Sequence, residues 1–242
     1  MRIVPYLCLS AAMLLLGSCA KDLSCYRDMI IGSWVEQSFD EQFVMTNLRD
    51  VYIFDRKNLV QILRIPEQDG RNRTIDTTAV HYEVYCKILS LFDFSAQQDY
   101  EVITFTDSTL RIRMTNNTIA YKKASSENAN AKRIQNLWEM THSSDPLVTP
   151  FRILFETNNT YRLFEYDNGD WEEKPDKAGA YAVFDTFLMT SGASCWDISF
   201  GGEEAEQYTS MNWQAVVSEN GHAIQKTFDF TQPLPVEEDA EL

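Results

Sequence analysis

Four blocks of the sequence recur in the same order roughly one hundred residues further along the chain. The blocks are rich in the aromatic and β-branched residues that suit strands. Any one match could arise by chance, but their common order indicates a tandem repeat. The matched blocks are Ile31–Glu36 with Gln135–Glu139, Val51–Ile62 with Ile153–Leu163, Tyr82–Phe92 with Tyr181–Ser191, and Tyr100–Phe105 with Tyr208–Trp213.

Apolar and polar residues alternate within each copy. From Leu110 to Met114, for example, apolar residues alternate with arginines, as in a strand with one face on a core and one in water. Turn signals separate such runs, and the pairs Asn168-Gly169 and Asn220-Gly221 suit type I′ hairpins. Short antiparallel strands joined by tight turns favour closed meanders, because closure removes exposed edges. The sequence therefore predicts an all-β chain of two tandem small antiparallel β-barrels.

Composition and charge predict where the two domains divide. The small, polar stretch 124–136 suits a linker or a short helix. Residues 26–124 carry a net charge of −2, whereas residues 125–242 carry −14. Such a strong acidic excess would keep the distal half away from an anionic membrane surface. We predict a first β domain at 26–124, a linker at 125–135, a second β domain at 136–232 and an acidic tail at 233–242.

The first eighteen residues have the pattern of a secretory signal peptide: Arg2, a mostly apolar run, and the small residues Gly17 and Ser18. The apolar run is too short for a comfortable membrane span. The sequence Leu16-Gly17-Ser18-Cys19 resembles the lipobox of bacterial lipoproteins. That resemblance implies that Cys19 is lipidated and becomes the new N-terminus, with residues 19–25 as a tether. An ordinary signal-peptidase cut after Ala20 is the alternative.

Lipidation would determine the location of the protein. A cysteine thiolate is the nucleophile that can take a diacylglyceryl group, and two or three acyl chains then anchor a protein firmly. In Gram-negative lipoproteins, Ala20 after the cysteine implies the outer membrane of the cell envelope. Lys21-Asp22 resembles part of a short charged signal for export to the cell surface in gut Gram-negative bacteria. The periplasmic and surface faces both remain open.

A second resemblance concerns the fold. A short helical segment leading to Gly32-Ser33-Trp34 is similar to the Gly-x-Trp motif of lipocalins. Together with the repeat, it resembles the tandem lipocalin-like lipoproteins of gut Gram-negative bacteria. The resemblance implies structural roles for Trp34 and Trp138, each packing across the base of its barrel. The second copy has Asn136 where the motif has glycine. Such domains bind many things, so the resemblance implies no particular ligand.

The sequence contains no recognisable catalytic motif, and we expect no enzyme activity, no cofactor and no metal site. His81, His142 and His222 lack metal-site spacing. Asp167–Glu173 is more typical of an acidic hairpin tip than of a calcium loop. Glu203 and Glu204 are adjacent carboxylates in a glycine-led loop, where exposed acids are common. A disulfide between Cys25 and Cys86 remains open, and Cys195 is expected to be a buried hydrophobic residue.

Two non-enzymatic functions remain. The first is a binding or interaction module that holds an envelope or surface protein. The second is a carrier with a small apolar or glycan ligand in a barrel cavity. Barrels of this size tend to fill their interiors with side chains, which favours the first. A net charge of −15 makes nucleic acid an unsuitable partner, because a phosphate backbone needs a basic footprint.

Overall fold

The computed structural model describes residues 26–37, 39–40, 43–44, 49–65, 74–85, 87–93, 95–114, 117–191, 194–204, 207–219 and 222–233. Several predictions fall outside these residues. They are the signal peptide 1–18, the tether with its lipidated Cys19, the pairing of Cys25 with Cys86, the Asn220-Gly221 turn and the acidic tail beyond 233.

The chain forms two compact units. The described residues of the first unit lie within 1–37, 51–62 and 77–124, and those of the second lie within 38–50, 63–76 and 125–242. Each unit is built around one closed antiparallel β-barrel of eight strands. This confirms the predicted all-β fold of two tandem barrels.

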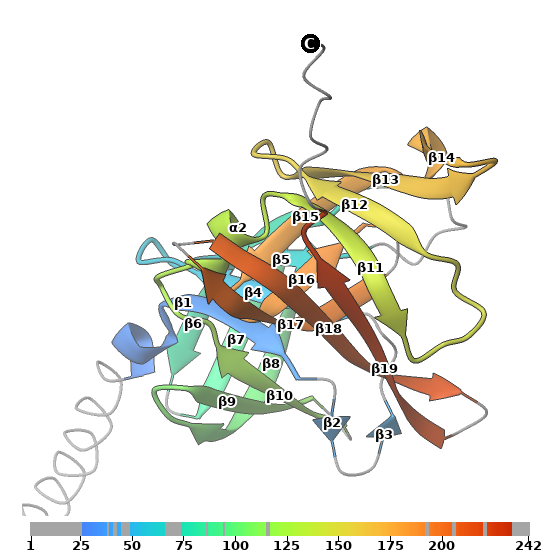
Figure 1. Ribbon diagram of the computed structural model, residues 1–242. Helices are drawn as coiled ribbons and strands as arrows, with labels where there is room; N and C mark the ends of the chain where they lie inside the picture. Colours follow the sequence, from blue (N-terminus) through green and yellow to red (C-terminus); the bar gives the residue numbers. More distant parts are fainter. Residues whose placement is uncertain are drawn as a thin grey trace, which may run out of the picture. The chain divides into compact units, whose positions relative to one another are not determined.

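The first barrel has the strand order β1-β10-β9-β8-β7-β6-β5-β4 and closes where β1 pairs with β4 (Figure 1). A helical turn at residues 26–30 leads into it. A small separate hairpin is formed by β2 (Phe39–Asp40) and β3 (Phe43–Val44). The barrel strands are β1 (Gly32–Glu36), β4 (Val51–Phe54), β5 (Leu59–Arg64), β6 (Asp76–Tyr85), β7 (Ile88–Asp93), β8 (Ala96–Phe105), β9 (Thr109–Met114) and β10 (Asn117–Lys123).

The second barrel has the strand order β12-β11-β19-β18-β17-β16-β15-β13 and closes where β12 pairs with β13. A ninth strand, β14, adds to β13 outside the closed ring (Figure 1). The strands are β11 (Leu137–Ser143), β12 (Phe151–Phe155), β13 (Thr160–Asp167), β14 (Asp170–Glu173), β15 (Gly179–Phe184), β16 (Phe187–Thr190), β17 (Ser194–Glu204), β18 (Gln207–Glu219) and β19 (His222–Thr231), with short helices α2 (Asn130–Arg133) and η1 (Pro175–Lys177).

Alternate side chains along the strands of each barrel form one buried cluster. In β6, for example, Val80 and Tyr82 are buried while His81 and Glu83 are exposed. The first cluster centres on Trp34, Tyr82 and Leu89, and the second on Trp138, Phe155 and Trp213. These side chains occupy the barrel interiors, as expected for barrels of eight strands.

The same local structure occurs in both barrels: a tyrosine hydroxyl group binds the turn that follows the second barrel strand. We call this structure the corner. Asn58 and Asn159 adopt left-handed conformations with φ of 63° and 64°, which asparagine tolerates better than most residues. The hydroxyl groups of Tyr82 and Tyr181 donate to the carbonyl oxygens of Asp55 and Glu156, both at 2.8 Å. Burial raises the pKa of both tyrosines. The corner confirms the alignment of the second and third sequence blocks.

The fourth sequence block was aligned incorrectly. Tyr100 lies on β8, but Tyr208 lies on β18, which occupies the place of β9 in the second barrel. The strand equivalent to β8 is β17: Phe105 contacts Trp34 and Phe200 contacts Trp138 with the same geometry, a ring separation of 5.8 Å and an interplanar angle of 53°. The error arose because aromatic residues at a spacing of two occur in many strands and do not distinguish one strand from the next.

Both tryptophans predicted to be structural are fully buried at the entry to the first strand of their barrels. The indole Nε1 of Trp34 donates to the carbonyl oxygen of Ile30 at 2.7 Å, and that of Trp138 donates to Ile134 at 2.9 Å. In both cases the acceptor lies four residues earlier, at or just after the end of a short helix. Each indole therefore satisfies its single donor inside the core.

The two barrels differ in the residues that surround Trp34 and its equivalent Trp138. Lys123 lies 5.2 Å from the Trp34 ring centre and donates to the carbonyl oxygen of Met29, and burial lowers the pKa of Lys123. Gly32 has a φ of +123°, and a Cβ there would lie 3.0 Å from the Cε of Lys123. In the second copy Asn136 is absent from the residues with positive φ, so its side chain meets no such restriction.

Replacing Gly32 by alanine is expected to destabilise the first barrel by about 1 to 3 kcal/mol, because the new side chain would be strained at positive φ. Chemical denaturation should detect the loss. Asn136→Ala is the matched control in the second copy and should change stability by less than half as much. An equal effect of the two substitutions would contradict this account of the glycine.

The stretch 124–136, expected to be a linker or a short helix, contains the short helix α2 and forms the folded entry to the second barrel. Asn130 and Ile134 are buried. Asn128 and Asn130 donate from their side-chain amides to the carbonyl oxygens of Val183 and Asp185. The polar residues that resembled a linker in the sequence thus bind backbone groups of β15 and the turn that follows it.

Candidate binding surface on the second barrel

A group of aromatic and charged side chains lies on the outer face of the second barrel, across β11, β12, β13 and β14. The strand registers place it there: Glu139 lies opposite Arg152, Arg152 opposite Phe164, and Tyr166 opposite Trp171. Their sequence neighbours Trp138 and Ile153 point into the core. We call this group the β11–β14 face and define it as Glu139, Arg152, Glu156, Asn158, Thr160, Arg162, Phe164, Tyr166, Trp171 and Glu173.

The aromatic part of the face is organised by Arg152. Its guanidinium carbon lies 4.3 Å from the centre of the Trp171 ring, and its Nη2 lies 2.6 Å from Oε2 of Glu139. Trp171 in turn contacts Tyr166 edge to face, with ring centres 5.3 Å apart. Tyr166 is 59% exposed. Arg152 and its ion pair with Glu139 fix the position of the Trp171 ring. Tyr166 packs against this fixed ring.

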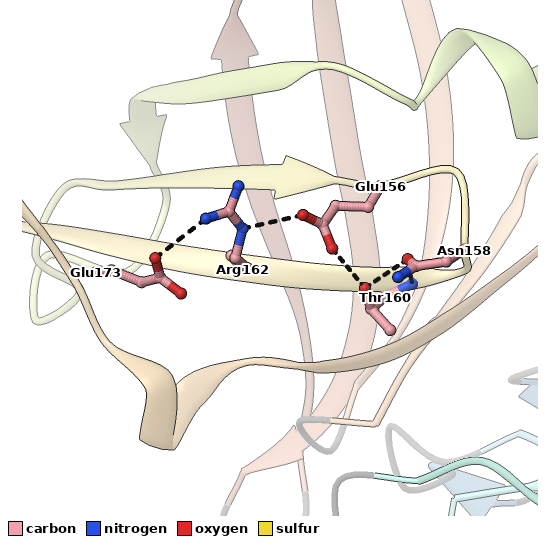
Figure 2. Close-up of polar contacts among 5 residues, drawn as sticks. All are labelled: Glu156, Asn158, Thr160, Arg162 and Glu173. Carbon is pink, nitrogen blue, oxygen red and sulfur yellow. Dashed lines mark hydrogen bonds and ion pairs between the residues drawn. The ribbon is translucent and has the colours of Figure 1, made fainter.

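The polar part of the face is organised by Arg162 (Figure 2). Arg162 lies between two carboxylates, with Nε 3.1 Å from Oε1 of Glu156 and Nη1 3.2 Å from Oε2 of Glu173. The hydroxyl group of Thr160 donates to Oε2 of Glu156 at 2.7 Å and lies 2.6 Å from Oδ1 of Asn158. Partly exposed ion pairs contribute little to stability. Their clearer effect here is to fix the orientation of neighbouring side chains.

The hairpin that carries Tyr166 and Trp171 has the predicted tight turn. Asn168 and Gly169 both have positive φ, 51° and 101°, as a type I′ turn requires. The acidic stretch Asp167–Glu173 is therefore a hairpin tip, as expected from its sequence. On the opposite side of the hairpin, Lys174 and Lys177 form ion pairs with Glu172 and Glu165.

The chemistry of the β11–β14 face suits binding. Tryptophan, tyrosine and arginine are the residues that most often dominate binding energy at interfaces. Tyrosine and tryptophan also lose little conformational entropy when they are held at a contact. The alternating arginines and glutamates offer donors and acceptors beside the rings. This combination can hold a ligand or protein surface without any covalent step.

The other sequence candidates are not brought together at one site. His81 and His142 are exposed on different barrels, and Cys195 is buried. The side chains of Glu203, Glu204 and His222 lie outside the described part of the chain. Among the described residues, no group of three or more His, Cys, Asp and Glu residues is placed to hold a metal ion.

Sequence reasoning missed Arg152, Arg162, Tyr166 and Trp171 as a group. A signal was present, because Thr160, Arg162, Phe164 and Tyr166 alternate with residues of the opposite face along one strand. The alternation predicts a shared face within β13. It cannot predict which side chains of β11, β12 and β14 join that face, because strand register depends on the tertiary structure.

No protein-family model and no curated protein matches the sequence. One similar solved structure is a porin-like protein from Bacteroides uniformis, with 11% identity, coverage of 82% of this chain and 96% of that chain, and a TM-score of 0.19. This TM-score is too low to support an inference about fold or function. Within the part of the chain that the structure describes, no helix has the length and apolar character needed to cross a membrane.

Proposed function

We propose that the protein is a lipid-anchored lipoprotein of the outer membrane that acts as a non-enzymatic binding module for an envelope or surface partner. In this proposal Cys19 carries the lipid, and the two barrels are lipocalin-like domains. The β11–β14 face of the second barrel makes the contact with the partner.

The observation that carries the proposal is the exposed Tyr166 supported by Trp171 and Arg152. The Tyr166 ring is 59% exposed and packs on Trp171, which Arg152 holds in place. Such an exposed, well-ordered ring is suited to contact with a partner protein. The buried clusters add support, because they leave specificity to the outer surface.

The carrier function is the second candidate, and the packing of the barrels favours it less. Its ligand would need interior space that Trp138, Phe155 and Trp213 share in the second barrel. Native mass spectrometry of the protein purified from its source distinguishes the two. A mass equal to the polypeptide with its acyl chains supports the module, whereas an additional small molecule released by organic solvent supports the carrier.

Site-specific photo-crosslinking in living cells tests the binding surface. A photoreactive phenylalanine analogue at Tyr166 should give a discrete adduct with one partner, and Trp171→Ala in the same chain should lower its yield at least tenfold. A loss of about 2 kcal/mol, typical of a central aromatic contact, corresponds to roughly a thirtyfold weaker affinity.

The analogue at Leu147 is the matched control. Leu147 is 90% exposed on the loop between β11 and β12 of the same unit and is not part of the β11–β14 face. Adducts of equal yield from both positions would indicate random collisions. That result, or the absence of any adduct from Tyr166, would contradict the assignment of this face.

A further inference from the structure

One end of the first barrel is basic, although the whole chain carries a net charge of −15. Because neighbouring strands are antiparallel, the turns β4–β5, β6–β7 and β8–β9 lie at the end where the helical turn 26–30 enters the barrel. Contacts confirm this placement: Arg27 donates to Oδ1 of Asn58 at 2.9 Å, and the ring of Tyr26 stacks on Phe105 at 5.4 Å. We call this part of the molecule the tether end.

Cations outnumber carboxylates at the tether end. Arg27, Arg56, Lys57 and Lys87 are exposed, and Lys123 is half-buried beside Trp34. The carboxylates among the described residues here are Asp28, Asp55 and Asp107, and Asp55 accepts hydrogen bonds from the backbone N–H groups of Lys57 and Leu59. Four exposed cations and the half-buried Lys123 therefore outnumber three carboxylates at this end of a chain whose net charge is −15.

Exposed apolar side chains lie next to these cations. Tyr85 and Ile88 are directly opposite each other on β6 and β7, with exposures of 61% and 44%. Ile103, at 38% exposure, lies on β8 two residues beyond Glu101, the register partner of Ile88. Glu101 itself is paired with Arg113. An apolar patch beside cations, with a tyrosine, is the composition that favours a bilayer interface.

The position of Cys19 indicates what this end would meet. Six residues, 20–25, lie between Cys19 and Tyr26, the first described residue, and the seven steps from Cys19 to Tyr26 span at most about 25 Å when fully extended. A lipid at Cys19 would therefore hold the tether end close to the bilayer. The positive charge of the tether end complements anionic headgroups. The net charge of −14 on residues 125–242 opposes any approach of that half to the bilayer.

We propose that the tether end of the first barrel docks on an anionic phospholipid surface through Arg56, Lys57, Lys87 and the patch of Tyr85, Ile88 and Ile103. The proposal rests on lipidation of Cys19 for its orientation in the cell, but the docking surface itself belongs to the folded barrel. Docking would add electrostatic and apolar contacts to the acyl anchor and would point the tether end towards the bilayer.

Vesicle co-sedimentation of the mature chain made without lipid, from Ala20 to Leu242, tests the docking separately from the anchor. It should bind vesicles containing phosphatidylglycerol and leave vesicles of phosphatidylcholine alone largely unbound. Arg56→Gln with Lys57→Gln should weaken binding roughly 25-fold, because each basic residue near an anionic surface contributes about fivefold. High salt should release the protein, since it screens these charges.

Two matched controls distinguish docking from a general charge effect. Lys174→Gln with Lys177→Gln removes two cations from the second barrel, and it should weaken binding much less than the variant in the β4–β5 turn. Ile88→Ser should weaken binding, whereas Leu147→Ser, an exposed leucine of the other unit, should have no effect.

Three results would overturn the proposal: equal binding to both vesicle types, equal losses in the two double charge variants, or dissociation of a dimer by Ile88→Ser without vesicle binding. The last result would assign the patch to contact with a second copy. Failure of palmitate to label the wild-type protein would contradict the anchor instead, and it would leave the co-sedimentation result unchanged.

Discussion

Replacing Trp34 or Trp138 by alanine is expected to lower the free energy of unfolding of that residue's own barrel by about 3 to 5 kcal/mol. Both side chains are completely buried, and the indole is the largest side chain that a core can lose. The substitution also removes contacts of the indole ring. Trp34 loses its ring contact with Phe105 and its hydrogen bond to Ile30. Trp138 loses the equivalent interactions with Phe200 and Ile134. Such a loss is a large share of the total stability of a small domain.

Urea unfolding followed by circular dichroism measures this effect. Trp171→Ala is the matched control, because it removes the same side chain from the surface and should cost less than about 1 kcal/mol. Trp→Phe at positions 34 and 138 retains most of the apolar volume, so its smaller loss of stability combines the missing indole N–H with a smaller cavity. Unchanged unfolding of either alanine variant would show that the tryptophan does not support its barrel.

Replacing Cys19 by serine is expected to abolish membrane attachment. The acyl chains attach through the thiolate, and a hydroxyl group is too weakly nucleophilic to replace it. Two or three chains anchor a protein firmly, so their loss changes the distribution from bound to released. Radiolabelled palmitate should enter the wild-type protein and be absent from Cys19→Ser, which should also leave the membrane fraction.

Cys25→Ser is the control for this experiment, since it removes a nearby thiol and should retain the label. Mass measurement of the mature N-terminus separates the two cleavage sites. Label persisting in Cys19→Ser would refute lipidation at that residue. A mature chain that begins at Lys21 would identify an ordinary signal-peptidase cut after Ala20.

Local sequence chemistry was sufficient to predict alternating strands, tight turns and the alignment of the two copies on either side of the repeated corner. The alternation in β6 and β9 reflects one buried and one exposed face, which any barrel strand must have. Asn58, Asn159 and the Asn168-Gly169 pair occur at positive φ, where few other residues are tolerated. The alignment of Tyr82 with Tyr181 succeeded because the corner requires a hydroxyl group at a fixed place on the strand.

Local chemistry was insufficient where the answer depended on a partner distant in the sequence. The sequence left both a linker and a short helix open for the stretch 124–136, because the acceptors of Asn128 and Asn130 lie more than fifty residues away. The fourth repeat block was matched by aromatic spacing, whereas the equivalence of β8 and β17 follows from which ring contacts each buried tryptophan. The reason for glycine at position 32 was hidden as well, because the φ of +123° belongs to the folded backbone.

The sequence by itself determined the class of fold, the duplication and the places where the chain turns, because these follow from residue periodicity and backbone preference. Only the tertiary structure decided which outward side chains share a surface. Arg152, Arg162, Tyr166 and Trp171 come from three strands, and their grouping depends on strand register. Register in turn reflects how alternate residues of every strand fill one core, a property of the whole barrel and not of any one segment.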